Sequence, residues 1–471
     1  MKKIMIYVAL LAVTFTSCSD FLTEEPKQSQ SNELTLSKHL NEATAGCYAR
    51  LQSYTWYGAY HILAADLTGG NMKHSMTLAG SNRYTNANEV SWNFTATNTS
   101  SIWSYCYYTI NSCNEVLGNI GNDATGASQA TLNNWTAEAL FLRALCHFDL
   151  VTTYAQPYTY APDSLGVPIM LKSDLAAKPK RNTVREVYNQ IVADLTAADS
   201  LMADGYYRTT GTDKFAFASK PAIEALLSRV YLYMGNWQKC ADYATKVISS
   251  GKFQLADKAT YRTMWTNNVA ADGGEVIFEL YSSNKNAYWD GSGWEGISYV
   301  CDPAGSGDVC ATNDIYSMYE DGDVRKELFV ANENEHFTTK YAGKAGSATP
   351  KENNVIILRL SELYLNRAEA LMNGAVISGT SAAKDLKAIT DARGASVQSP
   401  SGTTIFNERR KELAFEGHLY YDYKRLKKSI TRTDFDGSLN KDVTFPGYLW
   451  AYPISKNELD ANPNMVQNAG Y

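Results

Sequence analysis

The sequence predicts a mostly α-helical protein, a scaffold of tetratricopeptide-like helical hairpins with large irregular insertions and a minor β component. Apolar residues recur at helical spacing in stretches spread along the 471-residue chain. Three of these stretches share a Glu followed five residues later by an Arg, in the runs EALFLRA, EALLSRV and ELYLNRA that begin at Glu138, Glu224 and Glu362. The spacings between these glutamates are unequal, so long insertions interrupt the repeated unit.

The first residues are typical of an export signal. Lys2 and Lys3 precede a mostly apolar run, Ile4 to Phe15, and small residues lead into Cys18. This pattern predicts a lipoprotein signal peptide over 1–17, with Cys18 as the lipid-attachment residue and 18–32 as a flexible tether. Ordinary secretion with an unmodified Cys18 is the alternative. Residues 33–471 are expected to form one domain.

Helical periodicity defines the elements that follow. The apolar spacing predicts helices over 33–53, 101–120, 133–155, 183–203, 218–250, 355–373, 380–392 and 403–417. The clearest unit runs from Pro221 to Gly251, where two helices flank Gly235 and Asn236. Small residues, among them Ser228 and Cys240, are expected where the two helices cross.

Two insertions, 54–100 and 252–354, are rich in Gly, Asn, Ser, Thr and aromatic residues. A short helix is expected near 312–320, and strands over 275–281 and 90–95. Cys301 and Cys310 flank a Gly-rich loop, so a disulfide between them and two free thiols are both compatible with the sequence. The other cysteines within helical patterns are expected to be small buried residues. Around Gly322, Asp321 and Asp323 predict a turn followed by a capped helix.

Charge and motifs exclude several functional classes. The net charge of −6 does not suit a nucleic-acid-binding protein. The nucleophile-elbow, zinc-helix and phosphate-loop motifs do not occur, and GSGWEG (291–296) lacks the strand and helix of a dinucleotide site. No cofactor, metal site or catalytic residue is predicted, and calcium binding is left open. Two carboxylates suffice for glycoside hydrolysis, so a glycosidase stays possible.

Aromatic residues suggest where a ligand binds, because the chain holds 32 Tyr, 15 Phe and 9 Trp. Flat rings stack on the C–H faces of sugars, while amide, carboxylate and guanidinium groups bond to the hydroxyls. Such residues crowd the two insertions, although each ring is also able to pack an insertion onto the helices. The predicted ligand contacts are Trp56, Asp66, Asn71, Arg83, Trp92, Tyr288, Trp289 and Trp294.

Several segments resemble one family. The run CSDFLTEEP after the signal peptide, ERRKELAFEGHLYYDYKRL (408–426) and YPISKNELDANPNMVQNAGY (452–471) are similar to the RagB/SusD family of Bacteroidetes outer-membrane lipoproteins, and YEDGDVRKE (319–327) and RLSELYLNRAEA (359–370) agree. The resemblance extends over the whole mature chain. It implies a bundle of tetratricopeptide-like helix pairs that supports an irregular ligand-binding face.

The resemblance also implies a function. We expect a non-catalytic, cell-surface protein of the outer membrane that binds a glycan and covers a TonB-dependent, SusC-like transporter. Acidic residues behind Cys18, such as Asp20 and Glu24, resemble the signal for the outer leaflet. A peptide-binding member of the same family and an all-α glycoside hydrolase are the alternatives. The charged run from Arg409 to Arg425 is expected to form ion pairs within the scaffold.

Overall fold

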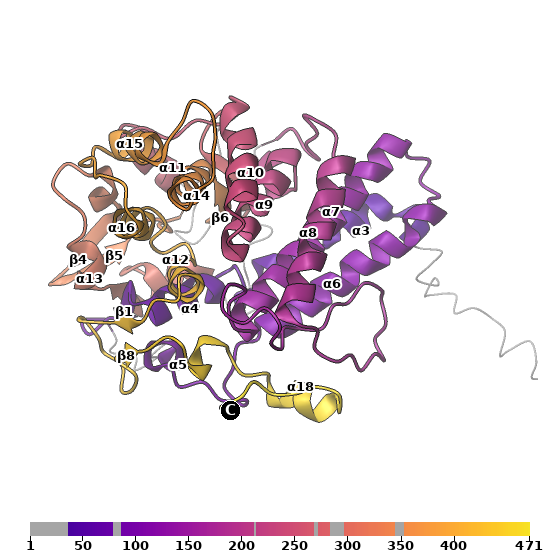
Figure 1. Ribbon diagram of the computed structural model, residues 1–471, viewed down its shortest axis with the longest axis horizontal. Coiled ribbons are helices and arrows are strands. Elements are labelled where there is room, and N and C mark those ends of the chain that lie inside the picture. The colour runs from indigo at the N-terminus through magenta and orange to yellow at the C-terminus, as the bar shows by residue number, and fades with distance from the viewer. Residues whose placement is uncertain (1–35, 79–85, 212, 268–271, 283–295, 344–352) are drawn as a thin grey trace, which may run out of the picture.

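The computed structural model describes residues 36–78, 86–211, 213–267, 272–282, 296–343 and 353–471. Helices dominate this part of the chain and the strands are short, as predicted (Figure 1). The main helices are α6 (Ile102–Asn119), α7 (Gln129–Tyr154), α8 (Val184–Leu201), α9 (Lys220–Met234), α10 (Trp237–Ser249), α14 (Leu360–Met372), α15 (Ala382–Arg393) and α16 (Gly402–Glu412).

These helices pack as a succession of neighbours. Helix α7 lies between α6 and α8, α8 contacts α9, α9 pairs with α10, and α14 lies between α10 and α15. In Figure 1, α6, α7 and α8 lie at the right of the molecule, α9 and α10 lie near its centre, and α14 and α15 lie to the left. Each helix buries an apolar face against the next, which is the expected helical-hairpin scaffold.

The predicted hairpin between Pro221 and Gly251 is confirmed. Gly235 ends α9 with a φ of +68°, a conformation in which a side chain is unfavourable. The Asn236 side chain then accepts a hydrogen bond from the Lys239 amide and begins α10. The Ser228 hydroxyl donates to the Cys240 carbonyl oxygen at 3.1 Å, so small residues do lie where the helices cross.

The three Glu-to-Arg signatures have a structural role that their spacing did not reveal. The arginine of each signature forms an ion pair with a different helix, and all three pairs are buried: Arg143 with Asp194 of α8 at 2.7 Å, Arg229 with Glu362 of α14 at 2.6 Å, and Arg367 with Asp385 of α15 at 2.7 Å. The arginine of each signature therefore joins its own helix to a second helix of the scaffold.

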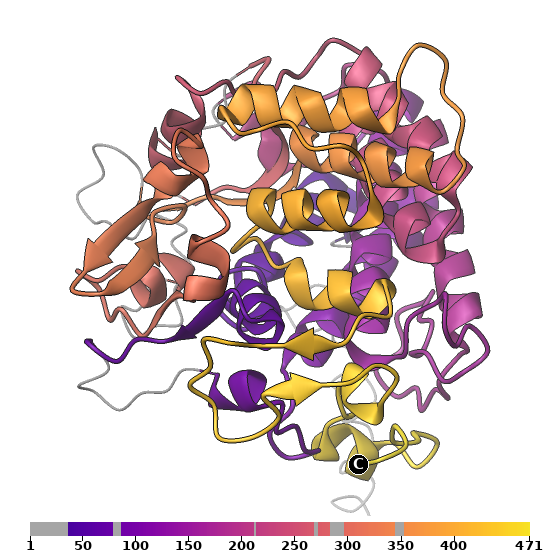
Figure 2. The same ribbon diagram turned by 60° about the vertical axis from the view of Figure 1, so that its left-hand side comes forward.

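In the part of the chain that the structure describes, the strands form three small antiparallel sheets. The largest has the order β1 (Met72–His74), β3 (Val309–Ala311), β5 (Glu335–Thr338) and β4 (Phe329–Asn332). Strand β2 (Val276–Leu280) pairs with β6 (Val355–Arg359), and β7 (Ile430–Thr431) pairs with β8 (Asp442–Val443). The predicted strand over 275–281 is thus confirmed. In Figure 2, the last sheet and the yellow C-terminal segment lie below the orange helices.

Shorter helices occur among the same described residues. They are α3 (Leu40–Gly46), α4 (Tyr60–Gly69), α5 (Ala87–Ser91), α11 (Tyr261–Asn267), α12 (Gly296–Cys301), α13 (Asn313–Tyr316), α17 (Leu419–Arg425) and α18 (Lys456–Ala461). The 3₁₀ turns are η1 (Ala49–Gln52), η3 (Ile120–Asn122), η4 (Lys214–Ala216), η5 (Val324–Leu328) and η6 (Tyr448–Trp450). As expected, Asp323 caps the turn that follows Gly322, because its side chain accepts from the Arg325 amide.

Three predicted elements are wrong in part. The helix expected over 355–373 begins as strand β6, because residues 355–359 pair with β2. The strand expected over 90–95 is instead the end of α5 followed by irregular chain. The helix expected over 33–53 is divided into α3 and η1. Helix α4 was missed because nearly all of its residues are buried, which removes the one-sided pattern of a surface helix.

The seven cysteines among the described residues are free thiols and buried. Cys301 and Cys310 are both free thiols, so the disulfide that the sequence left open does not form. Cys47, Cys106, Cys113, Cys146 and Cys240 are also free and buried, as expected. Among the described helices, none combines the length and apolar composition that crossing a bilayer requires.

Candidate functional site

Four of the predicted ligand contacts lie in the protein core. Trp56, Trp92 and Asp66 are 0 % exposed, and Asn71 is 1 % exposed. Trp56 donates its ring N–H to Asp149 of α7 at 2.8 Å. Asp66 accepts from the Asn71 amide at 2.7 Å. In this structure these side chains offer no surface to a ligand.

Hydrogen bonds and ring contacts give these buried residues a structural role in the aromatic-rich insertion. Trp92 donates its ring N–H to the Thr68 carbonyl oxygen and packs edge-on against Trp450, with 4.9 Å between ring centroids. Asp66 also accepts the backbone amides of Phe415 and Gly417. In place of the expected ligand contacts, these residues join the first insertion to the C-terminal part of the chain. Arg83, Tyr288, Trp289 and Trp294, the other predicted contacts, lie outside the described residues.

The charged run of the C-terminal segment forms a buried ion-pair network, as predicted. Glu412 accepts from Arg325, Arg359 and Arg393 at 2.7–2.9 Å, and Glu275 pairs with the last two of these arginines. Burial alone would raise the pKa of Glu412, yet Arg393, Arg359 and Arg325 hold that pKa well below its usual range. The network contributes to the architecture, since each buried charge has a partner.

The network continues along the same segment. Glu416 accepts from Arg359 and Lys340, at 2.7 and 2.6 Å. Asp422 accepts from Arg409 and Arg425, each at 2.8 Å. Because every carboxylate in this segment is held by a cation, none is a free general base for chemistry on a substrate.

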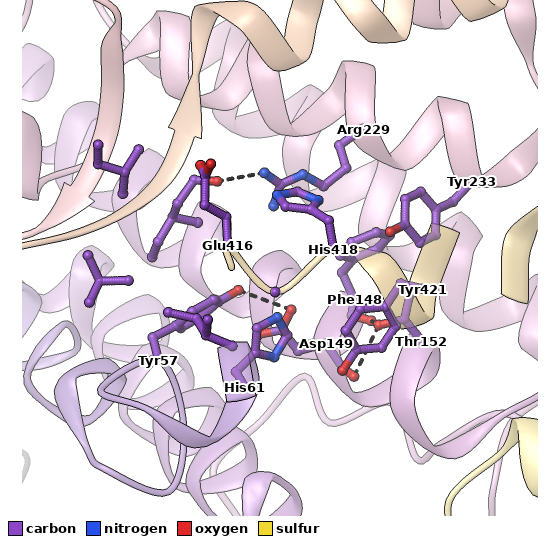
Figure 3. Close-up of a pocket in the computed structure, with 15 residues that line it drawn as sticks. Tyr57, His61, Phe148, Asp149, Thr152, Arg229, Tyr233, Glu416, His418 and Tyr421 are labelled. Atoms are coloured by element: carbon purple, nitrogen blue, oxygen red, sulfur yellow. Dashed lines mark hydrogen bonds between the residues drawn. The ribbon is translucent and has the colours of Figure 1, made fainter. Parts of the chain in front are cut away.

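A small polar cavity lies where α4, α7, α9 and the chain before α17 meet (Figure 3). Asp149 and Thr152 come from α7, His61 from α4 and Arg229 from α9, and His418 precedes α17. The Tyr57 hydroxyl donates to Asp149 at 3.1 Å, and Figure 3 shows Asp149 near the ring of His61.

Burial controls the charges around this cavity. Burial raises the pKa of Asp149 to about 7, although the bonds from Trp56 and Tyr57 act in the opposite direction. Burial, with a smaller effect of Arg229, lowers the pKa of His61 to about 3, and the pKa of His418 also lies well below its usual range. Both imidazoles are therefore neutral at neutral pH.

The cavity has the size of a water molecule. Its volume of about 20 Å³ is close to what one water needs, and a sugar ring does not fit. Nδ1 of His61 is buried and has no hydrogen-bond partner among the described residues, so a single water is its natural partner. The cavity thus has an acid and two imidazoles but no space for a substrate.

Spaces large enough for a ligand lie at the surface. An open hollow of about 450 Å³ lies at the ends of α9 and α14, beside Trp237 and Asn373. A second, of about 480 Å³, lies between Tyr160 and Tyr448. Sequence reasoning missed both tyrosines, although the runs QPYTY and FPGYLW place each of them two or three residues after a proline, a residue typical of turns.

Comparisons with known proteins identify similar chains. A family model described as starch-binding and associating with the outer membrane matches residues 20–232, and a model of the SusD family matches residues 283–471. The SusD-like protein P2 of Formosa agariphila is 26 % identical over the full length of both chains.

Solved structures have the same fold. A SusD superfamily protein from Bacteroides thetaiotaomicron superposes with a TM-score of 0.78 at 29 % identity, covering 92 % of this chain and 99 % of that one. The surface glycan-binding protein A of Bacteroides fluxus superposes with a TM-score of 0.74 at 23 % identity over the same shares, which shows a common fold. The predicted fold class is confirmed.

Proposed function

Because this chain belongs to the SusD/RagB family, we propose that it is a cell-surface glycan-binding lipoprotein, which captures oligosaccharides or polysaccharide and delivers them to a partner TonB-dependent transporter. The observation that carries this proposal is the agreement of two SusD-family models with the two halves of the chain. The names of relatives, such as the surface glycan-binding protein A of Bacteroides fluxus, support a glycan as the ligand class.

Capture without bond cleavage agrees with the chemistry of the described residues. Asp149 and the histidines beside it enclose a water-sized cavity, and the carboxylates of the C-terminal segment are held in ion pairs. Binding therefore takes place at the surface, where rings stack on sugars and amides bond to hydroxyls.

The ligand contacts that remain predicted from the sequence are Arg83, Tyr288, Trp289 and Trp294. Trp289 and Trp294 provide two broad rings within a Gly-rich run, and stacking on the C–H face of a sugar tolerates many glycans. Arg83 provides hydrogen-bond donors for hydroxyl groups. The glycan's identity depends on the polar groups around these rings.

The anchor and the partner extend the proposal. Lipidation of Cys18 would hold the protein on the outer membrane, with residues 18–32 as a tether long enough to let the domain move against a transporter. Metabolic labelling with a radioactive fatty acid tests the anchor, since Cys18→Ala should abolish incorporation.

Affinity purification of tagged protein from outer membranes tests the partner. Recovery of a TonB-dependent transporter is expected, and recovery of the protein alone would contradict delivery.

Glycan capture itself is tested by affinity gel electrophoresis of residues 19–471 in gels that contain plant, microbial or host polysaccharides. We expect one class of polymer to retard the protein. In that gel, Trp289→Ala or Trp294→Ala should weaken binding by about 1–3 kcal/mol, the value of one lost aromatic contact. Tyr108→Ala, which removes an exposed ring from α6, serves as the matched control and should leave retardation unchanged. If both Trp variants bind like the wild type, the sequence-predicted contacts are wrong.

A further inference from the structure

The loop after α7 and the C-terminal segment line an open hollow of about 480 Å³, here called the Tyr160–Tyr448 hollow. This volume lies in the range of about 300–1,000 Å³ that is usual for small-molecule sites. Apart from the two tyrosines, the residues that matter for recognition are Gln156, Ser164, Leu165 and Asn468. None of the described residues that line the hollow carries a charge.

Both tyrosine rings are half exposed, each with 47 % of its residue surface accessible, yet both are fixed. Tyr160 packs edge-on against Phe445, and Tyr448 packs edge-on against Tyr471, each with 5.0 Å between ring centroids. Gly470 has a φ of +100°, and a Cβ there would overlap the Tyr448 ring. A ring that is already ordered loses little conformational entropy when a ligand stacks on it.

The two walls of the hollow are joined by hydrogen bonds. The Gln156 amide donates to the Gly447 carbonyl oxygen at 3.1 Å. The Asn468 amide donates to the carbonyl oxygens of Tyr154 and Tyr452, at 2.8 and 2.7 Å. The hollow is therefore formed before any ligand arrives.

One buried acceptor at the hollow has no partner. The Oε1 atom of Gln156 is buried and accepts no hydrogen bond among the described residues. A buried carbonyl oxygen without a partner is costly, so the Gln156 side chain gains a hydrogen bond when it turns to accept from a ligand hydroxyl. An anionic ligand would find no cation in the lining, whereas a neutral polyhydroxylated ring finds aromatic faces, an amide and a hydroxyl.

We propose that the Tyr160–Tyr448 hollow binds a neutral sugar residue of the captured glycan. This contact is additional to the contacts that the sequence predicts at Arg83, Tyr288, Trp289 and Trp294. This inference rests on the proposed function, because it assigns another part of the same ligand. A long glycan that reaches both places would be held more tightly than a short one, since the second contact becomes intramolecular.

The test measures binding of neutral hexasaccharides of glucose (α-1,4, β-1,4 and β-1,3), xylose and mannose to residues 19–471 by saturation-transfer NMR and calorimetry. For the sugar that binds, Tyr160→Ala and Tyr448→Ala should each weaken binding by about fivefold or more. Tyr160→Phe and Tyr448→Phe keep the rings and should retain wild-type affinity, and Tyr108→Ala serves as the control. In a Trp289→Ala, Trp294→Ala background, residual binding should vanish when Tyr160 and Tyr448 are replaced by Ala.

The outcomes separate this inference from the proposed function. If the wild type binds a hexasaccharide and the Tyr160→Ala, Tyr448→Ala double variant binds it with unchanged affinity, the hollow is not a sugar contact, while glycan capture stands. If the wild type binds neither hexasaccharides nor any polysaccharide in the gels, glycan capture is overturned and this inference falls with it. A charged hexagalacturonate that binds the hollow more tightly than the neutral sugars would also overturn the assignment.

Discussion

Asp149→Asn is expected to change how stability depends on pH. Asp149 is buried beside the internal cavity, and burial raises its pKa from an ordinary value of 3.8 to about 7. The folded protein therefore holds this proton more tightly than the unfolded chain does. The stability that the protonated carboxyl contributes is fully present below the unfolded pKa, and it is lost as pH rises through the folded pKa.

The magnitude follows from the two pKa values. A shift of about three pH units corresponds to about 4 kcal/mol in total, of which about 2–3 kcal/mol is lost between pH 5 and pH 8. Asn cannot ionise, yet its amide is able to bond to Trp56 and Tyr57 as the carboxyl does. The variant should therefore avoid this loss and gain stability relative to the wild type as pH rises.

The assay is unfolding by guanidinium chloride at pH 5 and pH 8, with the free energy of unfolding compared between wild type and variant. Asp163→Asn is the matched control, because Asp163 is exposed and pairs with Arg185 at the surface. We expect the Asp149→Asn advantage to grow by about 2–3 kcal/mol between the two pH values, and the control to show no such growth. Parallel pH profiles for wild type and Asp149→Asn would refute the reasoning.

Three further predictions concern the scaffold. Glu412→Gln removes the charge that pairs with three buried arginines, so it should lower the free energy of unfolding by about 3–5 kcal/mol in denaturant titrations. Asp391→Asn, which breaks an exposed pair with Lys387, should lower it by less than about 1 kcal/mol. Gly394→Ala should lower the free energy of unfolding by at least about 1 kcal/mol, because the φ of Gly394 is +67° and an added Cβ would lie 2.8 Å from the Gly322 carbonyl oxygen. Gly118→Ala, in an open position on α6, should be neutral or stabilising. Equal effects of the two substitutions would contradict this account. Thiol titration of residues 19–471 should detect seven thiols after denaturation and almost none in the folded protein, because all seven are free and buried; five would indicate a disulfide.

The scaffold was predictable because its signal is local. Helices α6 to α10 follow from apolar spacing, and the hairpin at Gly235 follows from turn chemistry over a few residues. The same logic fails for residues 355–359, whose apolar run suits a helix but pairs with β2 about 80 residues earlier in the chain. A partner so distant leaves no trace in a local pattern.

The candidate site was less predictable because composition does not distinguish a ligand-binding ring from a packing ring. Trp56 and Trp92 lie in a polar, aromatic insertion, yet both are in the core, since the insertion needs rings and buried N–H partners of its own. Tyr160 and Tyr448 are nearly 300 positions apart, and only the fold brings them to one hollow. The charged C-terminal segment was correctly interpreted as ion pairs because its acids and bases alternate at close spacing.

The central claim, glycan capture without cleavage, is tested most directly by isothermal titration calorimetry of residues 19–471 with the oligosaccharides of the polymer that retards the protein, followed by mass spectrometry of the recovered sugar. The account predicts saturable binding, with every oligosaccharide recovered at its original length. Shortened products would identify a glycosidase, and the absence of heat with all oligosaccharides, together with saturable binding of a peptide, would contradict a glycan ligand.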